Sequence, residues 1–174
     1  ILSTKYGKCI RFESKKLRVF KGRSSKGIKG IVLAPNDEIV SLSIIDNDKN
    51  LKKSSNNKDQ KAEIKAKEKF ILSITENGFG KKSSIDDFRS QNRGGKGVIA
   101  IKTSERNGDM VSATLVNDTS SIMLISDKGT MIRTSCNQIP TLTRNTQGVK
   151  IITPKEGEKI MECVRIDEED AEDQ

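Results

Sequence analysis

Short apolar runs, each followed by a glycine turn, recur along the chain. They cover residues 1–4, 70–75 and 122–126, and the turns that follow are Tyr6-Gly7, Asn77-Gly78 and Lys128-Gly129. Apolar runs of this length between turn residues are typical of β-strands, and Asn-Gly suits the positive φ angles of a two-residue hairpin. Later in the first two units, apolar residues alternate with other residues, which predicts half-buried strands. The apolar positions are Val40, Leu42 and Ile44 in the first unit and Val111, Ala113 and Leu115 in the second.

Three units of the chain share one frame of glycines and cations. A cation stands four residues before a glycine that precedes an apolar run, at Arg23, Arg93 and Arg144. A second cation stands four residues after the glycine of each hairpin, at Arg11, Lys82 and Arg133. A repeated unit made of a few strands buries its apolar face only against neighbouring units, so the repetition predicts propeller-like blades.

We therefore expect an all-β chain with about four short strands in each of three blades, at 1–46, 70–117 and 118–166. The segment 47–69 reads as a basic linker rich in Lys, Asn and Ser, with a short helix possible at 58–69. It is interpreted either as a solvated connection or as a flexible arm that adds phosphate contacts. Residues 167–174 form an acidic tail.

Charge separates the blades from the tail. The formal net charge is +8, yet the last eight residues hold six acids and no base, which leaves a net charge of about +14 on the rest. This asymmetry is typical of a polyanion binder with an acidic tail. Hydrophobic residues make up 33% of the chain and aromatic residues 3%, which favours thin cores shared between blades over one thick core.

The residue types of common active sites do not come together in this sequence. Histidine is absent, and Asp86-Asp87 stands in a predicted turn where solvation is the simpler role. Cys9, Cys136 and Cys163 are odd in number and widely spaced, so they predict small strand residues and neither a disulfide framework nor a metal site. We expect no catalytic residue, metal site or cofactor in this stretch.

The sequence also predicts where the protein is located and that the chain is part of a longer one. No run approaches the roughly 20 apolar residues of a membrane span, and no signal peptide pattern opens the chain. We expect a soluble, cytoplasmic protein. The chain begins without Met and within a strand pattern, so we expect it to be part of a longer protein.

The repeated cations predict a binding surface. If the units are arranged around an axis, Arg11, Lys82 and Arg133 form one row on an edge of successive blades, and Arg23, Arg93 and Arg144 form another, with Lys26 beside it. Few aromatic residues are present, so phosphate contacts with a duplex are favoured over base stacking on a single strand. Such binding is independent of sequence. The alternative is that these cations serve solubility.

One heptad links this surface to a known family. In the stretch 91–97, Gly94 and Gly95 free the backbone while Arg93 and Lys96 supply cations. The stretch resembles the Gln-Arg-Arg-Gly-Gly-Lys-Gly box in the C-terminal domain of the A chain of bacterial DNA gyrase, with Asn92 in place of the first arginine. Further stretches resemble the last blades of that domain, namely 75–81, 103–108, 125–130 and 144–148.

The resemblance implies a β-pinwheel, a six-bladed disc whose neighbouring blades exchange a strand and whose basic rim wraps double-stranded DNA. It implies DNA contacts from the heptad residues Gln91, Arg93, Gly94, Gly95, Lys96 and Gly97. It also implies an A2B2 holoenzyme, formed by the gyrase B subunit together with the rest of the gyrase A polypeptide, which supercoils DNA with ATP and Mg2+ bound elsewhere. In that family the acidic tail competes with DNA for the rim.

Three alternatives remain open from the sequence. The box of the family usually lies in the first of six blades, whereas 91–97 lies in the middle of three, so it is either the box or a box-like repeat. A topoisomerase IV C-terminal domain has related blades without an intact box. A propeller that binds protein through its face is the alternative from another class, and a salt titration of DNA binding distinguishes it from a DNA-binding rim.

Overall fold

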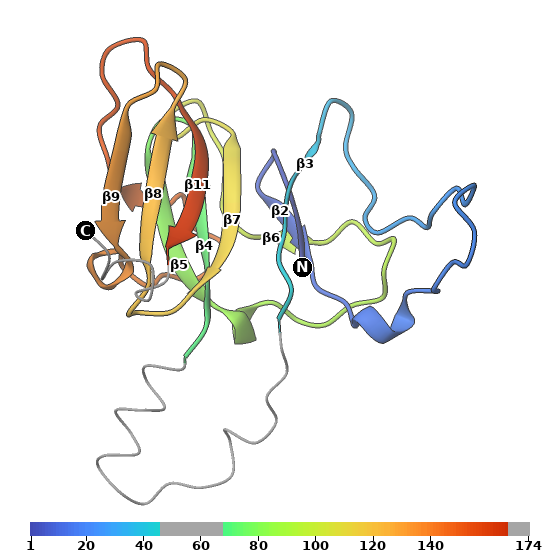
Figure 1. Ribbon diagram of the computed structural model, residues 1–174. Coiled ribbons are helices and arrows are strands. Elements are labelled where there is room, and N and C mark those ends of the chain that lie inside the picture. The colour runs from blue at the N-terminus through green and yellow to red at the C-terminus, as the bar shows by residue number, and fades with distance from the viewer. Residues whose placement is uncertain (46–67, 167–174) are drawn as a thin grey trace, which may run out of the picture.

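The computed structural model describes residues 1–45 and 68–166, which form three antiparallel sheets (Figure 1). The first sheet has the order β3-β1-β2-β6, with bounds Ile39–Leu42, Leu2–Thr4, Lys8–Ile10 and Val98–Ile99. The second has the order β10-β5-β4-β7, with bounds Val149–Lys150, Phe79–Ser84, Phe70–Thr75 and Met110–Val116. The third has the order β11-β8-β9, with bounds Ile160–Ile166, Ser121–Ser126 and Met131–Ser135.

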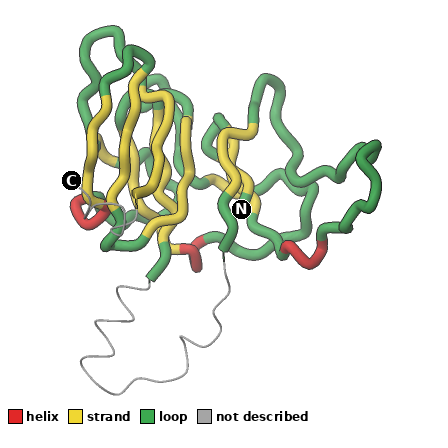
Figure 2. The backbone as a smooth tube through the Cα atoms, viewed as in Figure 1, coloured by secondary structure: helices red, strands yellow, loops and turns green. Residues whose placement is uncertain are grey.

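Single turns of 3₁₀ helix follow the second hairpin strand of each unit, and long loops dominate the first unit (Figure 2). The turns are η1 (Ser14–Lys16), η3 (Ile85–Asp87) and η4 (Cys136–Gln138). The prediction of an all-β fold with blades of about four strands is confirmed. The possible helix at 58–69 lies almost wholly outside the described residues, and the acidic tail 167–174 lies entirely outside them. No helix among the described residues is long and apolar enough to cross a membrane.

The first two sheets each take their outermost strand from the following unit. Strand β6 of the second unit pairs with β2, placing Val98 opposite Cys9, and β10 of the third unit pairs with β5, placing Val149 opposite Gly80. At the other side of the sheets, β3 contacts β7 and β7 contacts β11. The sheets are therefore arranged as blades whose inner strands are β3, β7 and β11, and β6 and β10 lie at the outer edge.

The repeated hairpin glycines make this exchange possible. Gly78 has a φ of 79°, and its carbonyl accepts hydrogen bonds from the backbone nitrogens of Ile151 and Ile152 at 2.9 and 3.2 Å. A Cβ at this position would collide with the carbonyl oxygen of Ile152. Gly7 is bonded in the same way to the segment after β6. The glycine frame in the sequence therefore marks the places where a following unit crosses the hairpin.

The hairpin turn itself differs from the prediction. A two-residue turn would need a positive φ at Asn77, but Asn36 is the one non-glycine residue with positive φ in the described part of the chain. Gly78 instead donates its backbone N–H to the Thr75 carbonyl at 3.0 Å, closing a three-residue loop with glycine in the left-handed position. This loop matches the twist of the strands with a single left-handed residue, and glycine adopts that conformation at little cost.

Two thin cores lie between neighbouring sheets. Strand β4 is buried along its whole length, with Ile71 in the cluster shared with the first sheet and Leu72 in the cluster shared with the third. Because successive strand residues point to opposite faces, this strand contributes to both cores. The cysteines belong to these cores, and burial raises the pKa of Cys9 and Cys163 to about 12 and of Cys136 to about 11. Cys9 and Cys163 are strand residues as predicted, whereas Cys136 begins η4.

The predicted half-burial of β3 and the residues after it is wrong for Leu42 and Ile44, which are 66% and 75% exposed. The hydroxyls of Ser41 and Ser43 face the second sheet and donate to the Ala113 carbonyl at 3.1 and 3.0 Å. Leu42 and Ile44 alternate with these serines and point to the opposite face, which no described element covers.

Candidate nucleic-acid interface

The heptad 91–97 forms the loop between η3 and β6, at the outer edge of the second unit. It runs beside residues 30–32 of the first unit, because Gly94 donates its N–H to the Gly30 carbonyl at 2.6 Å and Gly95 accepts from Val32 at 2.9 Å. Gly94 and Gly97 have positive φ angles of 76° and 70°. Gly95 does not, because it pairs as an extended residue with Ile31 in a parallel bridge.

The second row of predicted cations has a repeated geometry. Arg93 is exposed, and its Nη1 donates to the carbonyl of Lys29 at 3.3 Å. Arg144 is partly exposed, and its Nη1 donates to the carbonyl of Ile99 at 3.2 Å. Lys29 and Ile99 occupy the same place in their units, two residues after the last glycine of the frame. Each arginine is thus held by one nitrogen on the preceding unit, at the outer edge of the blades.

The remaining cations of this edge are exposed. Lys96 follows Arg93 in the heptad loop, and Arg23 and Lys26 occupy the corresponding loop of the first unit. The spacing of Arg23 to Lys26 equals that of Arg93 to Lys96.

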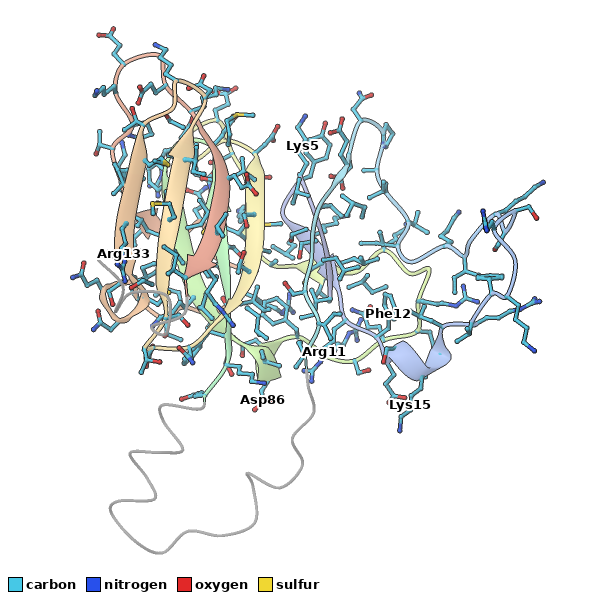
Figure 3. The ribbon with its side chains drawn as sticks, in the orientation of Figure 1. Lys5, Arg11, Phe12, Lys15, Asp86 and Arg133 are labelled. Atoms are coloured by element: carbon cyan, nitrogen blue, oxygen red, sulfur yellow. The ribbon has the colours of Figure 1, made fainter. Side chains whose placement is uncertain are left out.

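The other predicted row consists of Arg11, Lys82 and Arg133, and the first two of these residues bind other groups of the protein. Arg11 donates from Nη1 to the carbonyls of Ile85 and Phe88 at 3.0 and 3.1 Å, and so holds η3 of the next unit. Lys82 is 3% exposed, and its ammonium pairs with Asp118 and lies 5.0 Å from the centroid of a phenylalanine ring in β4. Arg133 is exposed and points away from β9 (Figure 3).

The first two heptad positions are also tied to the first unit. The backbone N–H of Gln91 donates to the Arg11 carbonyl at 2.8 Å, and the side-chain Nε2 of Gln91 is buried without a hydrogen-bond partner among the described residues. Asn92 accepts a hydrogen bond through Oδ1 from the ammonium of Lys16, at 3.3 Å. A cation from η1 therefore lies next to the position where the family's box has its first arginine.

Sequence reasoning did not single out four cations that the structure places near these loops. Lys81 is fully buried, and its ammonium donates to the carbonyls of Thr143 and Arg144 at 2.6 and 2.5 Å. The other three are exposed residues on or beside the outer strands, namely Lys102, Arg106 and Lys150. Lys150 carried a usable signal, because it repeats the place of Lys29 after the last glycine of the frame.

Comparison with known proteins agrees with this arrangement of repeats. Residues 1–46, 69–117 and 120–167 match a family described as the DNA gyrase C-terminal domain, a β-propeller. The chain belongs to this family. The resemblance seen in the sequence is thereby confirmed.

Relatives within the gyrase family are similar over nearly the whole chain. The gyrase A polypeptide of Salmonella typhimurium is 37% identical over 162 residues, covering 93% of this chain and 16% of the relative. Its counterpart in Haemophilus influenzae is 35% identical and covers 99% of this chain and 20% of the relative. The chain therefore spans about a fifth or less of the length of these relatives.

Two solved structures share the fold of this gyrase-family chain. The C-terminal domain of DNA topoisomerase IV superimposes with a TM-score of 0.78 at 21% identity, covering 97% of this chain and 46% of that one. A DNA gyrase A C-terminal domain superimposes with a TM-score of 0.73 at 18% identity, covering 95% of this chain and 50% of that one.

Proposed function

We propose that this chain binds double-stranded DNA along the outer edge of its blades and wraps it. The observation that carries the proposal is the repeated geometry of Arg93 and Arg144, each held by one nitrogen on the preceding unit at the same edge. A guanidinium has five N–H donors, so one bond to a carbonyl orients the group and leaves the others for phosphate oxygens. Equivalent cations on successive blades then follow one curved path.

The proposed phosphate contacts are the exposed cations Arg23, Lys26, Arg93 and Lys96 and the partly exposed Arg144 of this path, together with exposed Arg133 of the other row. Arg11 and Lys82 are used within the protein, since their cationic groups bind the carbonyls of Ile85 and Phe88 and the carboxylate of Asp118. Contacts of this kind position a duplex without reading its bases. Bending 20–30 base pairs by 40–90° costs on the order of 1–6 kcal/mol, which several phosphate contacts together offset.

Within the parent enzyme, we propose that wrapping supports ATP-dependent negative supercoiling by a bacterial, cytoplasmic DNA gyrase. The relatives named as gyrase A polypeptides support this proposal. The partners are the gyrase B subunit together with the rest of the gyrase A polypeptide in an A2B2 assembly, and ATP and Mg2+ act in those other parts. The wrapped duplex would present a crossing of fixed hand to the cleavage site.

The test compares two double variants with the same residue spacing. Arg93→Ala with Lys96→Ala should abolish supercoiling by the parent enzyme and leave relaxation and decatenation largely intact, because those reactions need cleavage but no wrap. Arg23→Ala with Lys26→Ala removes the same charge from the first unit and should weaken duplex binding while supercoiling persists. Normal supercoiling by the heptad variant would assign wrapping to another blade and make 91–97 a box-like repeat.

Two other functions have distinct outcomes in the same experiments. The fold similarity to the topoisomerase IV domain favours that enzyme as the alternative parent, in which case the wild-type enzyme decatenates but does not supercoil. A protein-binding propeller would show no duplex binding even at low salt. The DNA-binding edge instead predicts steep weakening of binding as salt rises.

A further inference from the structure

Two cations converge on one aromatic ring where the second and third units meet. The guanidinium carbon of Arg106 lies 4.8 Å from the centroid of the Phe79 ring, and the ammonium of Lys150 lies 5.4 Å from the same centroid. Lys150 belongs to the outermost strand β10, directly opposite Phe79 in β5. The cluster therefore lies at the outer edge of the second sheet.

The backbone that carries Arg106 is held in place. Asn107 is fully buried and donates from Nδ2 to the carbonyls of Lys102 and Gln147, at 3.0 and 3.1 Å. Asn77 donates to the carbonyl of Arg106 itself at 3.2 Å. These bonds fix the loop 102–108 against Gln147 of the third unit and against the β4–β5 turn, so Arg106 faces the ring at little entropic cost.

No carboxylate pairs with either cation among residues 1–45 and 68–166. Like charges on one ring repel each other, and the ring quadrupole offsets only part of that repulsion. An anion between the two cations would remove the repulsion. Phosphate suits this geometry, because guanidinium binds its oxygens as a planar fork and ammonium binds as a point charge.

We propose that Arg106, Lys150 and Phe79 form a phosphate-binding position for the DNA backbone, separate from the repeated arginines of the edge. The position binds one backbone phosphate through its two cations. It continues the path past Arg144, because the loop of Arg144 is bonded through Thr146 to Lys102 at 2.9 Å. This inference rests on the proposed binding of duplex DNA.

The test uses three variants of the natural full-length protein, with duplex binding measured across a range of salt concentrations. Arg106→Gln with Lys150→Gln should weaken binding and lower the slope of log affinity against log salt by about one, because the two cations share a single phosphate. Phe79→Leu keeps both charges but releases them from the ring, and should weaken binding about two- to fivefold. Unfolding curves that match those of the wild type show that the variants are folded.

A matched control removes two exposed lysines of the third unit, Lys128→Gln with Lys155→Gln, which lie in the β8–β9 turn and in the loop before β11. This control should leave the salt slope unchanged. The inference is overturned if the Arg106 and Lys150 variant behaves like the control or lowers the slope by two, or if Phe79→Leu binds like the wild type. Failure of the wild type itself to bind duplex at low salt would instead overturn the proposed function.

Discussion

A single lysine lies where the interior meets the outer edge of the blades. Lys81 is among the largest fully buried side chains of the described residues, and its ammonium holds the carbonyls of Thr143 and Arg144. Burial lowers the pKa of Lys81 to about 8, with a smaller opposing effect from Asp87. An ammonium in this place fixes the start of the loop that presents Arg144, but keeping it charged costs stability.

The stability contributed at this residue should therefore depend on pH. The unfolded chain has the ordinary lysine pKa of about 10.4, so between about pH 8 and that value it binds more protons than the folded chain. The free energy of unfolding should therefore rise with pH across this window. Between pH 7 and pH 9 it should rise by about 1 kcal/mol more in the wild type than in Lys81→Met. Denaturant unfolding at pH 7, 8 and 9 measures the difference, with exposed Lys102→Met as the control. A constant difference would mean that Lys81 is not the titrating group.

At the scale of elements, the exchange of strands explains which hairpin glycines are needed for stability. Gly78 and Gly129 hold the same place in their hairpins, with φ angles of 79° and 81°. A Cβ at Gly78 would meet the carbonyl of Ile152, whereas a Cβ at Gly129 would meet nothing within 4 Å. Alanine at either position takes a left-handed conformation, which costs about 1–2 kcal/mol. Only Gly78→Ala would also push β10 and the residues after it away from the hairpin.

We therefore expect Gly78→Ala to destabilise the 174-residue chain by about 1–3 kcal/mol more than Gly129→Ala. The extra cost comes from overpacking against the backbone of the following unit. Midpoints of denaturant unfolding measure it, provided that both variants keep the slope of the wild type. Equal losses would show that the crossing at Ile152 does not constrain the hairpin.

At the scale of the whole molecule, an open strand edge and exposed apolar residues lie in the first and third units of the described residues. Strand β9 pairs along one edge with β8, and no strand of the described residues pairs with its other edge. Val19, in the loop of the first unit, is 88% exposed, and Met131 at the start of β9 is 64% exposed. Open strand edges with apolar neighbours favour association with another chain or unit.

The isolated chain 1–174 should consequently self-associate or unfold more easily than a longer version that carries further repeats. Sedimentation measures the first outcome and thermal unfolding the second. Covering the open edge of β9 and the apolar loop of the first unit supplies the missing hydrogen bonds and burial, so the longer version should be monomeric and more stable. A monomeric chain 1–174 that melts cooperatively at the temperature of the longer version would contradict this.

The sequence by itself determined the repeat, the all-β class and the family, because these depend on local patterns. Apolar runs, turn glycines and a heptad such as 91–97 have the same spacing wherever the chain folds. The repeated positions of Arg23, Arg93 and Arg144 were also recognisable, since they depend on spacing alone, and their role in binding DNA stays a prediction. The sequence could not show that Gly78 meets Ile152, just after β10 of the next unit, because strand exchange joins residues far apart in the chain.

Only the tertiary structure decided what each cation contacts. Lys82 and Arg133 hold the same place in the repeat, yet one is buried against Asp118 and the other is exposed at an open edge. The convergence of Arg106 and Lys150 on one ring likewise depends on the pairing of β10 with β5. The physical reason is that burial and ion pairing are set by neighbours in space, which differ between repeats even where their sequences agree.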